Sequence, residues 1–184
     1  LFNGVASVQL EQYPQAVRSL RKGLDMAHDT ALKLQFYSNL GDAYHAAGNH
    51  AASDKAFEAA LKLDDSNGLI MNNYAYYLAL REQHLEKAAQ MSRESIRLEP
   101  ENVAYQDTYA WVLYKAGHYE EACKWIKKAI DTFPHSPTFL EHYGDILFRL
   151  GEKGQALEMW NKARELGGRS GILDKKIREK KLYD

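Results

Sequence analysis

The stretch VAYQDTYAWVLYKAGHY, residues 103–119, has three degenerate copies elsewhere in the chain. The copies LQFYSNLGDAYHAAGNH, GLIMNNYAYYLALREQH and PTFLEHYGDILFRLGEK begin at Leu34, Gly68 and Pro137. One position of every copy holds a small residue, at spacings of 34, 35 and 34 residues: Gly41, Ala75, Ala110 and Gly144. A fixed period of this length is typical of stacked arrays of supersecondary units. The period therefore predicts a chain built by repetition.

Each copy is followed by a second set of small residues. Ser53, Ala122 and Ala156 stand twelve residues after Gly41, Ala110 and Gly144, and Ala88 stands thirteen residues after Ala75. Seven residues later stand Ala60, Ser95, Ala129 and Ala163. Gly48, Gly117 and Gly151 mark a turn between the two sets, because a positive φ costs glycine little. We predict two amphipathic helices per copy, whose axes approach closely where the small residues face each other. Pro100 and Pro134 are expected to end the second helix.

This pattern resembles the tetratricopeptide repeat, in which small residues occupy the eighth, twentieth and twenty-seventh positions with aromatic or aliphatic residues between them. The resemblance covers residues 34–170 in four units. It implies an all-α fold, a right-handed superhelical α-solenoid of antiparallel helix pairs. An upstream unit that lacks its first few residues is indicated by Gly4, Ala16, Leu20 and Gly23. The departures from the pattern are Ser53, Asp65, Gly168 and the missing turn glycine at Glu82 and Gln83.

The resemblance divides the chain into one array and a tail. We expect a single array over 1–170, with a truncated repeat at 1–33 and full repeats at 34–67, 68–102, 103–136 and 137–170. In the tail, 171–184, Leu173 and Ile177 share one helical face, which predicts a C-terminal solvating helix that caps the last unit. The bases around that face are Lys175, Lys176, Arg178, Lys180 and Lys181. The alternative is that these bases contact an acidic partner.

Composition excludes several classes of function. The formal net charge of -1 gives no bulk field that favours nucleic acid. The single cysteine, Cys123, excludes a disulfide framework and a thiolate zinc site. No apolar run approaches the roughly 20 residues of a membrane-spanning helix. Because the sequence begins at Leu1 without a basic and apolar leader, we expect a fragment or a trimmed mature chain.

Helical periodicity divides the first helix of each unit into two faces. In the unit at 103–136, Tyr109 shares the packing face with Ala110, whereas Asp107, Trp111 and Tyr114 lie on the opposite face. We therefore expect that Asp107 and Trp111 lie outside the repeat core and that changing them leaves the melting temperature close to normal. First helices of tetratricopeptide repeats line a concave groove, so the resemblance implies that the opposite face binds a partner. The alternative is that Trp111 and Tyr114 pack against a neighbouring first helix without any ligand. The candidate partner-binding residues on this face are Asn39, Asp42, Asn72, Asn73, Tyr76, Asp107, Thr108, Trp111, Tyr114, Glu141, His142 and Asp145.

Two features of this face suggest a ligand chemistry. One repeat position holds the polar series Asn39, Asn73, Thr108 and His142. Amides in such a series donate to and accept from a peptide backbone of any sequence. Carboxylates beside the aromatic residues suit Lys or Arg through charge and cation–π contact. We therefore expect a protein or peptide partner that carries Lys or Arg beside apolar residues. The positions at which some tetratricopeptide-repeat proteins clamp a terminal carboxylate hold no base, which argues against that clamp.

Sequence patterns for catalysis are absent. No P-loop, nucleophile elbow or H-E-x-x-H pattern occurs, and the seven histidines never stand four residues apart. We predict a non-enzymatic scaffold without metal or cofactor, monomeric or weakly homo-oligomeric, that binds a peptide or partner helix and neither nucleic acid nor the membrane interior. The alternatives are a repeat segment of a larger enzyme, secretion or envelope-assembly protein, and a self-association module. The stretches NNYAYYLAL, DTYAWVLYKAG and EHYGDILFRLG also resemble repeats of long bacterial proteins, several of them exported, which favours the periplasm or cell envelope over the cytoplasm.

Overall fold

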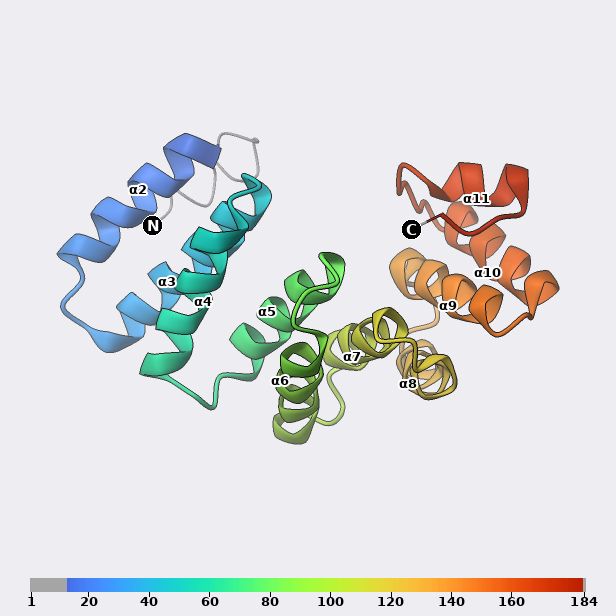
Figure 1. The fold of residues 1–184 in the computed structure, drawn as a ribbon, viewed down its shortest axis with the longest axis horizontal. Coiled ribbons are helices and arrows are strands. Elements are labelled where there is room, and N and C mark those ends of the chain that lie inside the picture. The colour runs from blue at the N-terminus through green and yellow to red at the C-terminus, as the bar shows by residue number, and fades with distance from the viewer. Residues whose placement is uncertain (1–12, 184) are drawn as a thin grey trace. The chain divides into compact units, whose positions relative to one another are not determined.

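The computed structural model describes residues 13–183, and within this range the chain forms helices and no strand. Figure 1 shows these helices following one another as short hairpins. The helices are α2 (Tyr13–Met26), α3 (Thr30–Ala46), α4 (His50–Leu63), α5 (Gly68–Leu80), α6 (Leu85–Leu98), α7 (Val103–Lys115), α8 (Tyr119–Thr132), α9 (Pro137–Arg149), α10 (Lys153–Glu165) and α11 (Leu173–Glu179). The all-α fold class predicted from the repeat is confirmed.

The packing of the helices divides the chain into two compact units. Unit 1 extends to Tyr77, and unit 2 runs from Leu78 to the end of the chain, so the division falls inside α5. In unit 1 the core includes Leu20 of α2 and Phe36 of α3. The predicted partial first repeat contributes α2, but its Gly4 lies outside the described residues. The expectation of one array over 1–170 stays a prediction.

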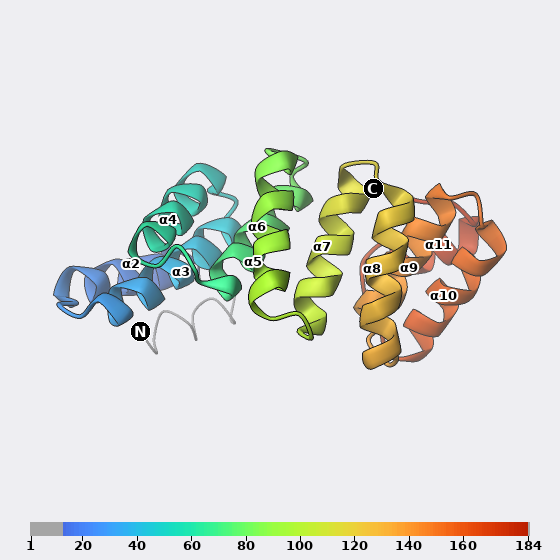
Figure 2. The ribbon, with the colours of Figure 1, turned by 90° about the horizontal axis from the view of Figure 1, so that it is seen from below.

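The α7–α8 pair of unit 2 shows how the local sequence makes a hairpin. Asn102 caps α7 by accepting hydrogen bonds from two backbone N–H groups of its first turn. After α7, Gly117 adopts a φ of 83°, and the N–H of His118 donates to the carbonyl of Leu113 at 2.9 Å. This left-handed ending satisfies carbonyl groups at the end of the helix. The chain then reverses, and Figure 2 shows α8 running antiparallel to α7.

Small residues allow the two helices of a pair to approach. A Cβ atom on Gly144 of α9 would lie 2.4 Å from the Trp160 ring and 3.1 Å from the carbonyl oxygen of Ala156 on α10. A larger residue at this position would collide with its own pair partner. In unit 1 the unusual Ser53 is accommodated because its hydroxyl donates to the carbonyl of Gly41 at 2.8 Å.

The turn that lacks a glycine, between α5 and α6, forms in a different way. Glu82 adopts a φ of 53° and His84 a φ of 49°, both in the left-handed region. The N–H of Gln83 still donates to the carbonyl of Leu78 at 3.0 Å, as in the glycine-containing turns. The helix ending is therefore kept, at the cost of two non-glycine residues in a conformation that side chains disfavour.

The tail packs on the last helix pair as α11. Leu173 is 1% exposed and belongs to one core cluster with Leu140 of α9 and Trp160 of α10. Ile177 packs against the same cluster. Lys176, however, is only 2% exposed. The expectation that Lys176 belongs to the solvated bases of the tail is wrong, because its side chain reaches α9, as described below. Within residues 13–183, no helix has the length and hydropathy needed to cross a bilayer.

Candidate functional site

Unit 1 contains an open pocket of about 200 Å³ between residues 34–39 of α3 and the first turn of α5. Leu69 at its edge is 56% exposed, which is unusual for a large aliphatic side chain on a helix that is otherwise mostly buried. The polar and apolar residues that line this pocket are Leu34, Gln35, Ser38, Asn39, Asn67, Leu69 and Ile70. We call it the α3–α5 pocket.

Some polar side chains of the α3–α5 pocket are hydrogen-bonded within the protein, and others are not. Asn67 caps α5, because its Oδ1 accepts from the N–H of Ile70 at 3.2 Å and its Nδ2 donates to Asp64. In the described part of the chain, Gln35, Ser38 and Asn39 make no side-chain hydrogen bond. Their amide and hydroxyl groups can therefore donate to and accept from a bound peptide.

Closer to the C-terminal ends of α3 and α5, side chains of unit 1 hydrogen-bond and stack with each other. The Tyr77 hydroxyl donates to Asp42 Oδ1 at 3.0 Å, and the Tyr77 ring stacks on His45 with centroids 3.8 Å apart. Burial raises the pKa of Asp42, and the hydrogen bond from Tyr77 opposes that rise. Burial and the Asp42 charge raise the pKa of Tyr77. Asp42 is thus engaged within the fold.

The three remaining candidates of unit 1 lie on α5. Asn72 is 7% exposed and donates through Nδ2 to Asn73 Oδ1 at 3.3 Å. The Oδ1 atom of Asn72 is buried and accepts no hydrogen bond from the described residues. Tyr76 is half-buried, with its ring centroid 6.0 Å from that of Tyr77. Asn72 thus contacts its neighbour Asn73, and Tyr76 contacts Tyr77.

In unit 2, side chains of α7 pack directly against side chains of α9. We call the face of α7 that carries Asp107 and Trp111, and the face of α9 that carries His142, the inner sides of these helices. His142 Nδ1 lies 2.8 Å from Asp107 Oδ1, and each side chain is 10% exposed. The His142 ring stacks on Trp111, with centroids 4.1 Å apart, and Trp111 stacks in turn on Tyr114 at 4.8 Å. Lys115 Nζ lies 5.3 Å from the centroid of the Trp111 ring. Charge, stacking and cation–π contact therefore all stay within the protein.

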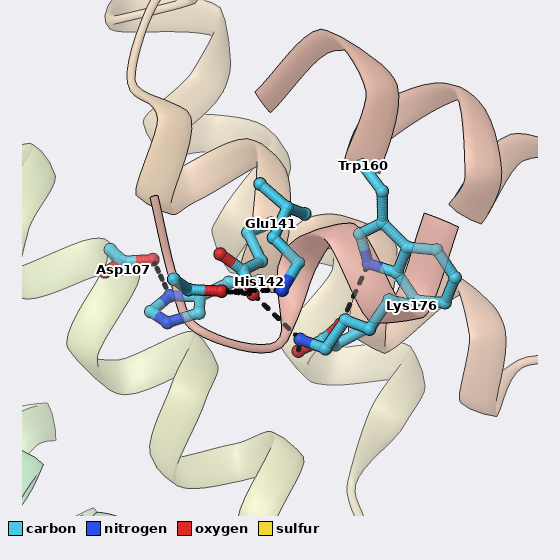
Figure 3. Close-up of polar contacts among 8 residues, drawn as sticks. Asp107, Glu141, His142, Trp160 and Lys176 are labelled. Carbon is cyan, nitrogen blue, oxygen red and sulfur yellow. Dashed lines mark hydrogen bonds and ion pairs between the residues drawn. The ribbon is translucent and has the colours of Figure 1, made fainter. Parts of the chain in front are cut away.

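A second polar cluster joins α9, α10 and α11 (Figure 3). Lys176 Nζ donates to Asp145 Oδ2 at 2.7 Å and to Glu141 Oε1 at 2.9 Å. The indole Nε1 of Trp160 donates to Asp145 Oδ1 at 2.9 Å. The hydroxyl of Ser170 donates to Glu141 Oε1 at 2.7 Å. Both carboxylates are thus bound by groups of the chain itself.

The charges of the two clusters act on each other. Burial raises the pKa of Asp145, while the charge and hydrogen bond of Lys176 and the charge of His142 lower it, and the net direction is upward. Burial by itself would lower the pKa of His142, but the charge and hydrogen bond of Asp107 raise it, as do the charges of Asp145 and Glu141, and the net direction is upward. The imidazolium form of His142 is therefore favoured by its acidic surroundings.

Comparison with protein families identifies the repeating unit. A model described as Tetratricopeptide repeat matches residues 34–67, and one described as Anaphase-promoting complex, cyclosome, subunit 3 matches residues 81–163. The resemblance of this chain to tetratricopeptide-repeat proteins is confirmed. Among curated protein sequences, none matches it significantly.

Solved structures share the tetratricopeptide-repeat fold. PilF of Pseudomonas aeruginosa aligns with 96% of this chain and 83% of its own length, at 21% identity and a TM-score of 0.75. PilW, a type IV pilus biogenesis factor, aligns with 96% of this chain and 82% of its own length, at 16% identity and a TM-score of 0.83. MamA aligns with 89% of this chain and 93% of its own length, at 16% identity and a TM-score of 0.69. At these identities the likeness establishes the α-solenoid fold and no more.

Within this repeat frame, the candidate residues of unit 2 have little exposed surface. Taken over the whole residue, Asp107, Trp111 and Tyr114 are 7%, 9% and 3% exposed. The expectation that Asp107 and Trp111 lie outside the core is wrong, because α9 covers them with His142. The candidates Thr108, His142 and Asp145 are buried as well, and Glu141 is 12% exposed. A partner role for these residues stays a prediction, whereas Asn39 lies beside an open pocket.

Two residues of the buried polar clusters were not predicted as site residues from the sequence, although the repeat period contains a signal for one of them. Lys176 and Trp160 were not among the candidates, yet both bind Asp145. Lys176 lies 35 residues after Glu141, the same separation as between Asp107 and His142. An acid followed by a cation or hydrogen-bond donor one period later is a signal that the sequence contains. Reading it requires knowing that consecutive first helices stack in register.

Proposed function

We propose that this chain is a non-enzymatic interaction scaffold and that unit 1 binds an extended peptide segment of a protein partner in the α3–α5 pocket. The tetratricopeptide-repeat fold is consistent with a protein-interaction scaffold. The observation that carries the proposal is the combination of exposed Leu69 with the polar side chains of Gln35, Ser38 and Asn39, which have no partner in the described chain.

The chemistry of the α3–α5 pocket points to the peptide backbone. The amides of Gln35 and Asn39 each offer two donors and one acceptor group, which suit the N–H and C=O groups of an extended chain. Leu69 offers apolar surface for one side chain of that chain. The acids that suggested a preference for Lys or Arg are bound to Tyr77, His142 and Lys176, so the pocket in unit 1 requires no positive charge on the partner.

The proposal is tested by selecting peptides from a random library on the whole protein and measuring their affinity for variants. Leu69→Asp and Asn39→Ala should each weaken binding by about tenfold or more, roughly 1.4 kcal/mol. Both should melt close to the parent, because Leu69 is exposed and Asn39 is only half-buried.

Leu63→Asp is the matched control, because Leu63 is also an exposed leucine of unit 1, at 40%, but lies at the end of α4. It should bind selected peptides as well as the parent does. Equal affinity for Leu69→Asp and the parent would show that recognition takes place elsewhere, with the inner side of α7 and α9 as the next surface to test.

A cell-envelope location is a further part of the proposal. PilW is described as a type IV pilus biogenesis factor, and both PilW and PilF match this chain over most of its length. Fractionation of cells that make the full natural polypeptide tests the location, with recovery in the cytoplasm contradicting it. The mass of that polypeptide tests whether these repeats serve a larger enzyme, and light scattering tests self-association.

A further inference from the structure

Three side-chain contacts in this chain have the same sequence separation. Tyr77 bonds to Asp42 within unit 1, and His142 to Asp107 and Lys176 to Glu141 within unit 2, each pair being 35 residues apart. In unit 2 the two contacts join α7 to α9 and α9 to α11. Helices α7, α9 and α11 are thus linked in series by acid–donor contacts.

The donor side chains of these three contacts are of types that change charge at different pH values. Tyrosine and lysine side chains ordinarily titrate near pH 10, whereas histidine ordinarily titrates near pH 6.5. The contact between Asp107 and His142 is therefore the one of the three whose charge can change near neutral pH. It is also well shielded, with both side chains 10% exposed and Trp111 stacked on the imidazole.

We propose that the Asp107–His142 contact is a pH-sensitive joint of unit 2, which holds α9 firmly on α7 when the imidazole is protonated and loosens when it becomes neutral. The charge count supports this. Two cations, His142 and Lys176, face three carboxylates in the two joined clusters. Loss of the imidazolium charge leaves one ammonium to balance all three.

Charged and titratable groups surround His142 on α9 itself and on the helices packed against α9. Asp145 and Glu141 raise the pKa of His142 together with Asp107, against the effect of burial. On the α8 side, the thiol of Cys123 is hydrogen-bonded to the side chain of Tyr143. The other groups that face this joint are Lys115 on the Trp111 ring, Trp160 on Asp145, and Lys176 between Glu141 and Asp145.

The direction of the pH effect follows from linkage. The pKa of His142 in the folded chain is raised above the ordinary 6.5. The folded state therefore binds this proton more tightly than the unfolded state does, and the pair stabilises fully below about pH 6.5. The stabilisation is lost as the pH rises through the folded-state pKa. Acidification should tighten the joint and alkalinisation should loosen it.

The test measures urea midpoints of the whole chain from about pH 6 to about pH 9, the range in which a histidine with a raised pKa titrates. The parent midpoint should fall as the pH rises. His142→Asn should remove this fall, because the asparagine amide can replace Nδ1 as donor to Asp107 but does not titrate there. His135→Asn, at an exposed histidine, is the matched control and should keep the parent profile.

A direct titration keeps the proposal testable even if His142→Asn does not fold. The ring signals of His142 in the parent should titrate above 6.5, and Asp107→Asn should lower that midpoint. The proposal is overturned if the ring titrates at or below 6.5, or if the parent and His142→Asn have the same pH profile.

Discussion

The ammonium group of Lys176 on α11 lies 2.7 Å from Asp145 Oδ2 on α9, and the two side chains are 2% and 4% exposed. This ion pair joins the tail to the last repeat through two buried charges. Trp160 holds the other oxygen of Asp145 through its indole nitrogen, so the carboxylate is oriented from two helices. A buried carboxylate bound in this way depends strongly on each of its partners.

Lys176→Met is therefore expected to destabilise unit 2 by roughly 3–5 kcal/mol, because it leaves Asp145 and Glu141 buried without their cation. Urea unfolding measures the change. Replacing the acids as well, by Asp145→Asn and Glu141→Gln, should recover part of the lost stability. A Lys176→Met variant as stable as the parent would show that the ion pair is not formed in solution.

Gly144→Ala should destabilise by about 1–3 kcal/mol through overpacking. The added methyl group would lie 2.4 Å from the Trp160 ring and 3.1 Å from a backbone carbonyl, so either the ring or the helix must move. Gly154→Ala is the matched control, because Gly154 lies in α10 and a Cβ there meets nothing within 4 Å. It should stabilise by roughly 0.5–1 kcal/mol through helix propensity. Thermal melts in which both alanines behave alike would contradict the close approach of α9 and α10.

Trp111→Ala is expected to cost about 3–5 kcal/mol, because it removes a large buried ring from between His142 and Tyr114. Helical periodicity by itself predicts, in contrast, that this position can be changed without loss of stability. Leu166→Ala is the control, since Leu166 belongs to the same unit but is 42% exposed. A Trp111→Ala melting temperature equal to that of the parent would return Trp111 to the list of exposed partner residues.

Removal of residues 171–184 should make the end of the array fray first. The deletion exposes Trp160, which is fully buried, together with the neighbouring apolar cluster that Leu173 covers. Repeat units depend on their neighbours for burial, so the loss should be local at first. Hydrogen exchange of α9 and α10 measures the effect, with α7 and α8 as internal reference. Unchanged exchange in α9 and α10 would show that α11 is not a cap.

Several elements of the fold are determined locally and could be predicted from the sequence. The 34- and 35-residue period marks the helix pairs, and the small residues mark where the pairs approach, as the tight space around Gly144 shows. The turn glycine at 117 and the cap at Asn102 are short-range features. These succeed because propensity, capping and the distance between paired helices depend on residues within one repeat.

The tertiary structure decided which polar and aromatic side chains are available to a partner. Periodicity places Trp111 on the inner face of α7, but its exposure depends on His142, which reaches it from the next first helix. Periodicity likewise places Lys176 among solvated bases, but its ammonium reaches two carboxylates on α9. A helical pattern sorts residues by direction around an axis. Whether that direction leads to water or to another helix depends on contacts about 35 residues away in sequence, which the pattern within one helix does not contain.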